Sequence, residues 1–321
     1  MRSTPLGLHF TSNHKQRKVV QSYAELTTLL VGPVAGFFVK TGIVALQMGC
    51  CVCYFIFVGA NVNALFNIDQ GVVMIAMLLC EAPLSLIRDI GNLNCTNTIA
   101  NAIIAICIFT VFACAAYTVA QNGVHEGIER GVKIDTAFLF FGMCVFAFEG
   151  SISGIIPIAA SLAPKDRNRF VPLFVVVVAW IGAVYLVYSI LSYLSYGPEV
   201  KTIVTLSLGD SIFPAATVRA AYVAAVVFTF PLMLFPASAE IERSMCKVDS
   251  GKIQQGCDVQ RVGGTILRLI LLLICWVCAF WGRSSLDHIV ALLGSLFSAP
   301  LALVVPPLLH RAVMVQKEVE V

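Results

Sequence analysis

The spacing of the charged residues is the feature that most constrains how this chain can fold. Lys40 and Asp69 enclose 28 residues without Asp, Glu, Lys or Arg, and Arg219 and Glu240 enclose 20. A helix that crosses the hydrocarbon core of a bilayer needs about 20 mostly apolar residues. Uncharged stretches of comparable length recur along most of the sequence. They predict a series of membrane-spanning helices.

The composition excludes an ordinary water-soluble domain. Charged residues make up 12% of the 321 residues and hydrophobic residues 59%, whereas an average soluble domain has about 25% charged residues. Too few charged side chains remain to form a polar shell around a core of this size. The sequence therefore predicts an all-α fold, a polytopic bundle of membrane helices whose main surroundings are membrane lipid.

Eight spans fit between the charges. We expect a single transmembrane domain at residues 41–310, a cytoplasmic segment before it at 1–40 and a cytoplasmic tail after it at 311–321. The second and the eighth spans each contain proline, which interrupts helical hydrogen bonding. The predicted spans lie near residues 42–65, 71–88, 98–120, 136–163, 171–196, 219–239, 264–282 and 288–309.

The distribution of Lys and Arg predicts the orientation, because these residues favour short cytoplasmic loops. With the amino terminus inside, 16 of the 21 basic residues fall on the inner side. We therefore expect both termini in the cytoplasm of a multi-pass protein of the plasma membrane or an internal membrane. An even number of spans also argues against a seven-helix receptor. Since the basic residues are sorted by membrane side rather than gathered on one patch, the net charge of +3 indicates no nucleic-acid partner.

The fourth predicted span has an unusual middle. Residues 146–157 place two glycines, two serines and Glu149 at mid-depth in the bilayer, where an ionised side chain costs roughly 2.5–3.5 kcal/mol. A helix broken there would offer carbonyl groups to an ammonium or cation and amide groups to a carboxylate, which suits a zwitterion. Glu149 could carry a proton. The alternative is a kinked helix in which Glu149 has a structural hydrogen bond only.

Other polar residues on apolar helices are weaker candidates. Glu81 precedes Pro83 and is either functional or part of a distorted helix end. Tyr54 is an interhelical hydrogen-bond partner or a substrate ligand, and Thr229, before Pro231, could contact a coupling ion. The cysteines at 50, 51, 53, 275 and 278 are read as packing residues rather than metal ligands. No enzymatic motif is present, and we predict no metal, no cofactor and no enzyme activity.

Several stretches resemble the amino acid/auxin permease family. Residues 146–150 read Phe-Ala-Phe-Glu-Gly, the pattern of that family's sixth helix. Similar stretches follow the family's order at residues 22–33, 54–61, 83–101, 230–237 and 293–310. The resemblance implies the fold of the sodium-coupled leucine transporter, with two inverted five-helix repeats and one further helix. The eight spans would then be helices three to ten, and the first two and the last would have no counterpart.

The resemblance implies transport of an amino acid coupled to protons or sodium, in full or truncated form. The predicted substrate-binding residues are Phe146, Phe148, Glu149, Gly150, Ser151, Gly154 and Tyr54, and the predicted coupling residues are Glu149 and Thr229. Phe146 and Phe148 would gate or line the pocket. The alternative is a protein that keeps the fold and binds an amino acid or a partner as a sensor without transport, because the family's broken first helix has no counterpart here.

Overall fold

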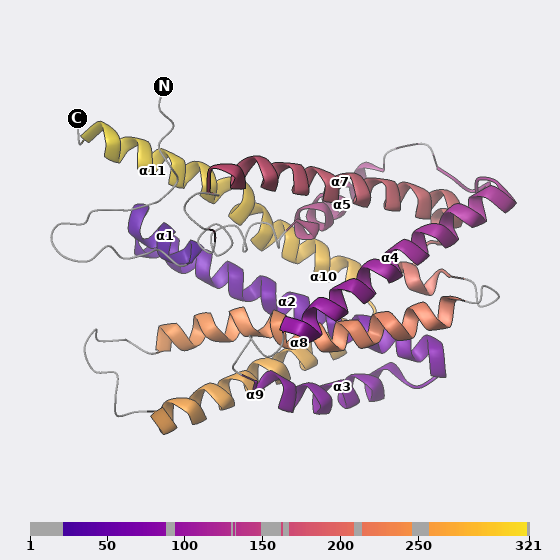
Figure 1. Ribbon diagram of the computed structural model, residues 1–321, viewed down its shortest axis with the longest axis horizontal. Helices are drawn as coiled ribbons and strands as arrows, with labels where there is room; N and C mark the ends of the chain where they lie inside the picture. Colours follow the sequence, from indigo (N-terminus) through magenta and orange to yellow (C-terminus); the bar gives the residue numbers. More distant parts are fainter. Residues whose placement is uncertain are drawn as a thin grey trace. The chain divides into compact units, whose positions relative to one another are not determined.

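A computed structural model describes residues 22–87, 94–129, 131, 133–148, 162, 167–208, 214–245 and 257–319 (Figure 1). Within these ranges the secondary structure is entirely helical, which confirms the predicted all-α class. The α-helices are α1 (Tyr23–Leu30), α2 (Pro33–Phe66), α3 (Gln70–Ser85), α4 (Asn94–Asn122), α5 (Ile134–Ala147), α7 (Arg167–Tyr196), α8 (Pro214–Met245), α9 (Cys257–Gly282), α10 (Leu286–Leu293) and α11 (Val305–Val319). The short 3-10 helices η2 (Gly197–Glu199) and η3 (Val204–Leu206) follow α7.

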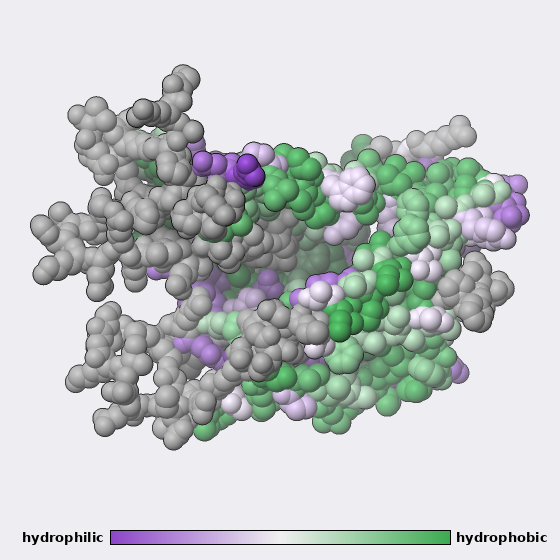
Figure 2. Space-filling model, in the orientation of Figure 1, coloured by the Kyte–Doolittle hydropathy of each residue, from purple (hydrophilic) through white to green (hydrophobic). Residues whose placement is uncertain are grey.

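The described helices form a polytopic membrane bundle, as predicted. Six are long and apolar enough to cross a bilayer: α2, α4, α7, α8, α9 and the continuous stretch from α10 to α11. The apolar helices α3 and α5 are shorter and stand at the second and fourth predicted spans. Apolar residues dominate the described surface on the face in Figure 2, and Phe138 and Trp281 are 83% and 84% exposed. Apolar side chains this exposed on membrane helices suit contact with lipid.

The last span widens between α10 and α11. The turns η4 (Gly294–Ser298) and η5 (Pro300–Val304) are π-helical, with one more residue in each hydrogen-bonded ring than an α-helix. Pro300, Pro306 and Pro307 lie in or just after these turns, and each lacks the backbone N–H that an α-helical bond needs. The helix thus continues through its prolines by loosening rather than by stopping.

The chain divides into two compact units. Unit 1 comprises the described parts of Met1–Ile43, Phe140–Leu186 and Ala291–Val321. Within it, the Ser22 side chain caps α1 by accepting from the Glu25 N–H at 3.1 Å, and the Tyr23 hydroxyl donates to the Leu301 carbonyl at 3.1 Å. Gly32, at φ +126°, makes the turn into α2. Helix structure therefore begins within the segment predicted as 1–40.

Unit 2 comprises Val44–Leu139 and Val187–Val290 and contains a large core of α2, α3, α8 and α9. Asp69 caps α3 by accepting from the Gly71 N–H at 2.8 Å. Gly71 lies near Phe280 of α9 and the other end of α3 lies near Arg268, so the two contacting helices run antiparallel (Figure 1). Among the most enclosed large side chains are Phe55, Ile56, Met74, Phe230, Leu234 and Leu272.

Candidate functional site

Two of the predicted site residues meet in the core of unit 2. The Tyr54 hydroxyl on α2 lies close to the Thr229 side chain on α8. The Tyr54 ring also packs on the Phe230 ring, with the two centroids 6.3 Å apart. The Phe55 ring packs on Phe230 as well, with centroids 5.3 Å apart. The sequence indicates Tyr54 and Thr229 as site residues for separate reasons. The structure places them in one cluster of hydroxyl groups against a buried aromatic ring.

The backbone around Thr229 explains how a polar site can exist inside this core. The Thr229 hydroxyl donates to the carbonyls of Ala225 at 3.0 Å and Val226 at 3.1 Å. Pro231 follows within α8 and has no N–H to donate to the carbonyl four residues earlier. A carbonyl without its helical partner and two side-chain hydroxyls supply oxygen atoms that can hold the polar end of a small solute or a cation.

Phe146 and Phe148 lie in unit 1 at the carboxyl end of α5. Phe148 packs against Tyr185 of α7, with ring centroids 5.8 Å apart and an interplanar angle of 61°. Close backbone packing positions this end of α5, because a Cβ atom on Gly142 would overlap the Ala291 carbonyl. Likewise, a Cβ on Gly294 would overlap the Gly142 carbonyl. Small residues permit such approach between membrane helices.

The centre of the predicted broken helix is outside the described part of the chain. Glu149, Gly150, Ser151 and Gly154 all fall there. Helix α5 ends at Ala147, and the Phe148 N–H donates to the Val145 carbonyl at 3.3 Å. The roles predicted for these four residues therefore stay predictions.

A polar cavity of about 760 Å³ opens at one end of unit 2, where α2, α4 and α7 finish. Gln70, His125, Glu199, Lys201 and Arg219 contribute to its walls. An adjoining cavity of about 370 Å³ shares Gln70, Glu199 and Lys201 and adds Arg283 and Asp287. The walls thus carry charges of both signs. They can attract both charged groups of a zwitterion.

A buried network that the sequence did not reveal holds one wall of this cavity. Arg219, at the start of α8, is 5% exposed and donates to the carbonyls of Thr205 at 3.0 Å and Leu208 at 2.9 Å. The Thr205 hydroxyl in turn donates to Asn61 of α2 at 2.6 Å. The connection from α7 to α8 is thereby folded against the helices. The available signal was an arginine at the start of an apolar span, which demands compensation.

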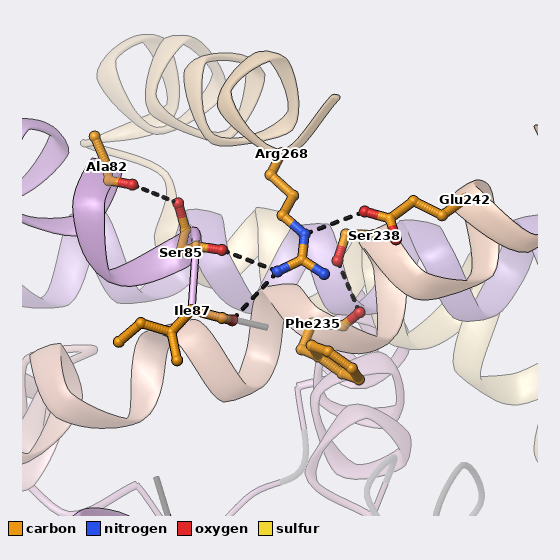
Figure 3. A network of polar contacts seen from close by, with 7 residues as sticks. All are labelled: Ala82, Ser85, Ile87, Phe235, Ser238, Glu242 and Arg268. Carbon is orange, nitrogen blue, oxygen red and sulfur yellow. Dashed lines mark hydrogen bonds and ion pairs between the residues drawn. The ribbon is translucent and has the colours of Figure 1, made fainter. Parts of the chain in front are cut away.

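A second buried arginine joins three helices at the other end of unit 2 (Figure 3). Arg268 of α9 donates through Nε to Glu242 of α8 at 3.2 Å, and through Nη1 to the carbonyls of Ser85 at 3.2 Å and Ile87 at 3.3 Å. Its guanidinium also lies 5.5 Å from the centre of the Phe235 ring. Arg268 thus caps α3 and links it to α8 and α9.

The sequence matches a known family over almost its whole length. Residues 7–320 fit the family described as transmembrane amino acid transporter protein. The chain belongs to this family. The membership confirms the resemblance found in the sequence, and it is a family of transporters rather than enzymes. No solved structure matches the chain.

Individual members of the family agree with this assignment. Vacuolar amino acid transporter 3 of Saccharomyces cerevisiae is 29% identical over 306 residues, which cover 92% of this chain and 43% of the relative. Vacuolar amino acid transporter 3 of Schizosaccharomyces pombe is 30% identical over 302 residues, covering 91% and 44%. An amino acid transporter of Arabidopsis thaliana is 26% identical over 244 residues, covering 71% and 53%. The chain spans less than half the length of the two yeast relatives.

Proposed function

We propose that this chain carries out secondary active transport of amino acids across an internal membrane. The observation that carries the proposal is the family match, which runs through every described apolar helix. The two yeast relatives are named vacuolar amino acid transporters, which supports an amino acid substrate and a vacuole-type membrane. The buried hydroxyl cluster of unit 2 offers polar groups that such a substrate needs inside a membrane protein.

The proposed substrate-binding residues form two groups, one in each unit. In unit 2, Tyr54 is the proposed ligand, and its contact with Thr229 and Phe230 supports the role. In unit 1, the proposed residues are Phe146, Phe148, Glu149, Gly150, Ser151 and Gly154. The sequence argument for a broken helix at 149–154 supports this second group, since exposed peptide groups can bind the carboxylate and ammonium of an amino acid.

Coupling to a proton or sodium gradient is proposed to involve Glu149 and Thr229. A carboxyl at mid-depth in a bilayer can be neutral when it faces apolar surroundings and ionised when hydrated. We expect Glu149→Gln to abolish proton-driven uptake and to spare exchange of amino acids across the membrane. The measurement compares uptake at several imposed pH gradients in wild-type and variant proteoliposomes. An unchanged pH dependence in the variant would clear Glu149 of this role.

The orientation is also part of the proposal. With both termini in the cytoplasm, the connections at 67–69, 123–133 and 197–213 lie on the non-cytoplasmic side. The polar cavity beside these connections is then the entrance for solute from that side. Charged walls of both signs support this use, because a zwitterion interacts favourably with each.

Flux measurements distinguish transport from the alternative of a non-transporting sensor. The purified chain is placed in lipid vesicles, and uptake of radiolabelled neutral amino acids is compared with protein-free vesicles. Binding is measured in parallel as the shift in melting temperature caused by the same amino acids. Uptake above the control supports the proposal. A thermal shift without any flux would support a sensor and contradict transport.

A further inference from the structure

Among the described residues, three charged side chains are buried in the protein: Glu81, Arg219 and Arg268. Each arginine donates to backbone carbonyls, and Arg268 also pairs with a carboxylate. Glu81 differs from both. It is 0% exposed, and neither of its carboxyl oxygens has a hydrogen-bond partner in the part of the chain that the structure describes. An exception of this kind in a buried position calls for a physical explanation.

The buried core that α3 shares with α2, α8 and α9 is apolar. The neighbouring core consists of Met74 and Met77 on α3 and Phe230, Leu234 and Leu272 from α8 and α9. From α2, the Cys51 thiol is close enough to interact electrostatically with Glu81. An ionised carboxylate in such a place would cost several kcal/mol without compensation. A neutral carboxylic acid removes most of this cost.

The buried arginine at the carboxyl end of α3 does not provide that compensation. Arg268 lies at the carboxyl end of α3, and its guanidinium is already bonded to Glu242, Ser85 and Ile87 (Figure 3). The Ser85 hydroxyl, one turn after Glu81, donates to the Ala82 carbonyl at 3.0 Å. The polar groups at this end of α3 are thus engaged with one another.

A metal cation is a poor match for the same position. Hard cations bind where several oxygen ligands converge, whereas the core that includes α3 consists of hydrocarbon and sulfur side chains. The described residues also contain no group of three His, Cys, Asp or Glu side chains able to hold a metal ion. The simplest ligand for an isolated carboxylate is a proton.

We propose that Glu81 is a proton-binding site of this transporter. Its carboxyl holds a proton while the helices enclose it and releases the proton when they separate and admit water. Pro83, two residues later, removes one backbone hydrogen bond from α3, so the helix can bend next to the carboxyl. The proposal rests on the proposed transport function and adds to it a second protonatable group, on a different helix from Glu149.

Infrared spectroscopy of the protein in lipid vesicles tests the site without any need for transport. A protonated carboxyl has a C=O stretching band separate from the bands of ionised carboxylates. We expect such a band at neutral pH in the wild type, loss of its Glu81 component in Glu81→Gln, and retention of that component at a shifted position in Glu81→Asp, which keeps the acid. A wild-type spectrum identical to that of Glu81→Gln would overturn the proposal.

Glu129→Gln is the matched control. Glu129 lies in the connection between α4 and α5 and accepts from Lys133 in an exposed ion pair of 2.6 Å, and this hydrogen bond raises the pKa of Lys133. Because Glu129 is exposed to water and paired with Lys133 rather than enclosed in the core, its replacement should leave the C=O band of the protonated acid unchanged. Loss of the band in this variant would assign it elsewhere and contradict the role of Glu81.

A transport measurement completes the test. In proteoliposomes, Glu81→Gln should lose the stimulation of uptake by a pH gradient while amino acid exchange without a gradient persists. If the protein transports amino acids but shows no band that depends on Glu81, the result contradicts the proton site and leaves the transport function standing. A band that depends on Glu81 in a protein that binds but moves no amino acid would support the proton site and contradict the proposed function.

Discussion

Glu81 and Arg268 are buried ionisable residues on contacting helices of unit 2, and they differ in their hydrogen bonding. Arg268 is bonded to a carboxylate and two carbonyls and lies over an aromatic ring. Glu81 has no hydrogen-bond partner among the described residues. A fully bonded buried charge stabilises one arrangement of helices. A carboxyl without partners is free to change its protonation state, so we assign structure to the first and function to the second.

Removing Arg268 should have the largest effect on stability. Arg268→Met leaves Glu242 and two carbonyls at the carboxyl end of α3 without their donor, and breaking a buried ion pair typically costs about 3–5 kcal/mol. The Glu242 side chain is 29% exposed and keeps some contact with water, so we expect about 3 kcal/mol. The melting temperature in detergent measures the loss. Arg283→Met, at an exposed arginine, is the control, and equal losses in both variants would contradict the structural role.

Arg219 tests whether carbonyl contacts alone give a similar but smaller effect. Arg219→Met removes charged hydrogen bonds to Thr205 and Leu208, and bonds to charged groups contribute about 1.5–3 kcal/mol each. We expect a loss of about 2 kcal/mol, because water can reach the freed carbonyls through the adjacent cavity. Lys201→Met on the same cavity wall should leave the melting temperature unchanged. An unchanged melting temperature in Arg219→Met would contradict the structural role that Arg219 is proposed to share with Arg268.

The helices could be predicted from the sequence more fully than the site. Long uncharged stretches identified α2, α4, α7 and α8 because lipid imposes a minimum apolar length. Helix α1 is only eight residues long, and its signal was the Ser22 and Glu25 spacing typical of a capped start. Because α1 is too short to span a membrane, the search for long uncharged stretches did not predict it as a separate helix.

The polar contacts could not be predicted in the same way. Arg268 bonds to residues 26, 181 and 183 positions away, and no local pattern encodes such pairs. Tyr54 and Thr229 were selected individually, but their contact depends on how α2 packs on α8. Glu81 was recognised as a carboxyl in an apolar helix, whereas its lack of partners emerged only from the packing around it.

Thr205 tests a neutral contact in the same network as Arg219. Thr205→Val keeps the shape of the side chain but removes the donor to Asn61. A buried acceptor left without its partner costs about 1–3 kcal/mol, and we expect about 1 kcal/mol because one neutral bond is lost. Thr205→Ser, which retains the hydroxyl, should restore most of the melting temperature. Failure of serine to restore it would mean that the methyl group, rather than the bond, matters.

Glu81→Gln should have the smallest effect on stability. If the wild-type carboxyl is neutral, an amide of the same shape replaces it at less than about 1.5 kcal/mol, the range for substitutions that conserve volume. The melting temperature should therefore stay close to that of the wild type at neutral pH. A loss as large as that of Arg268→Met would show that Glu81 has a charged partner and would end the contrast between the two residues.

Accumulation of an amino acid against its own gradient tests the central claim most directly. Vesicles containing the chain are loaded with equal internal and external concentrations of a labelled neutral amino acid, and a pH gradient is then imposed. If protons drive transport, the account predicts a transient accumulation that a protonophore abolishes. If sodium drives it, the accumulation appears only under an imposed sodium gradient and a sodium ionophore abolishes it. The second arm of the experiment imposes a sodium gradient instead. The account is contradicted if folded protein binds the amino acid but its internal and external concentrations stay equal under both gradients.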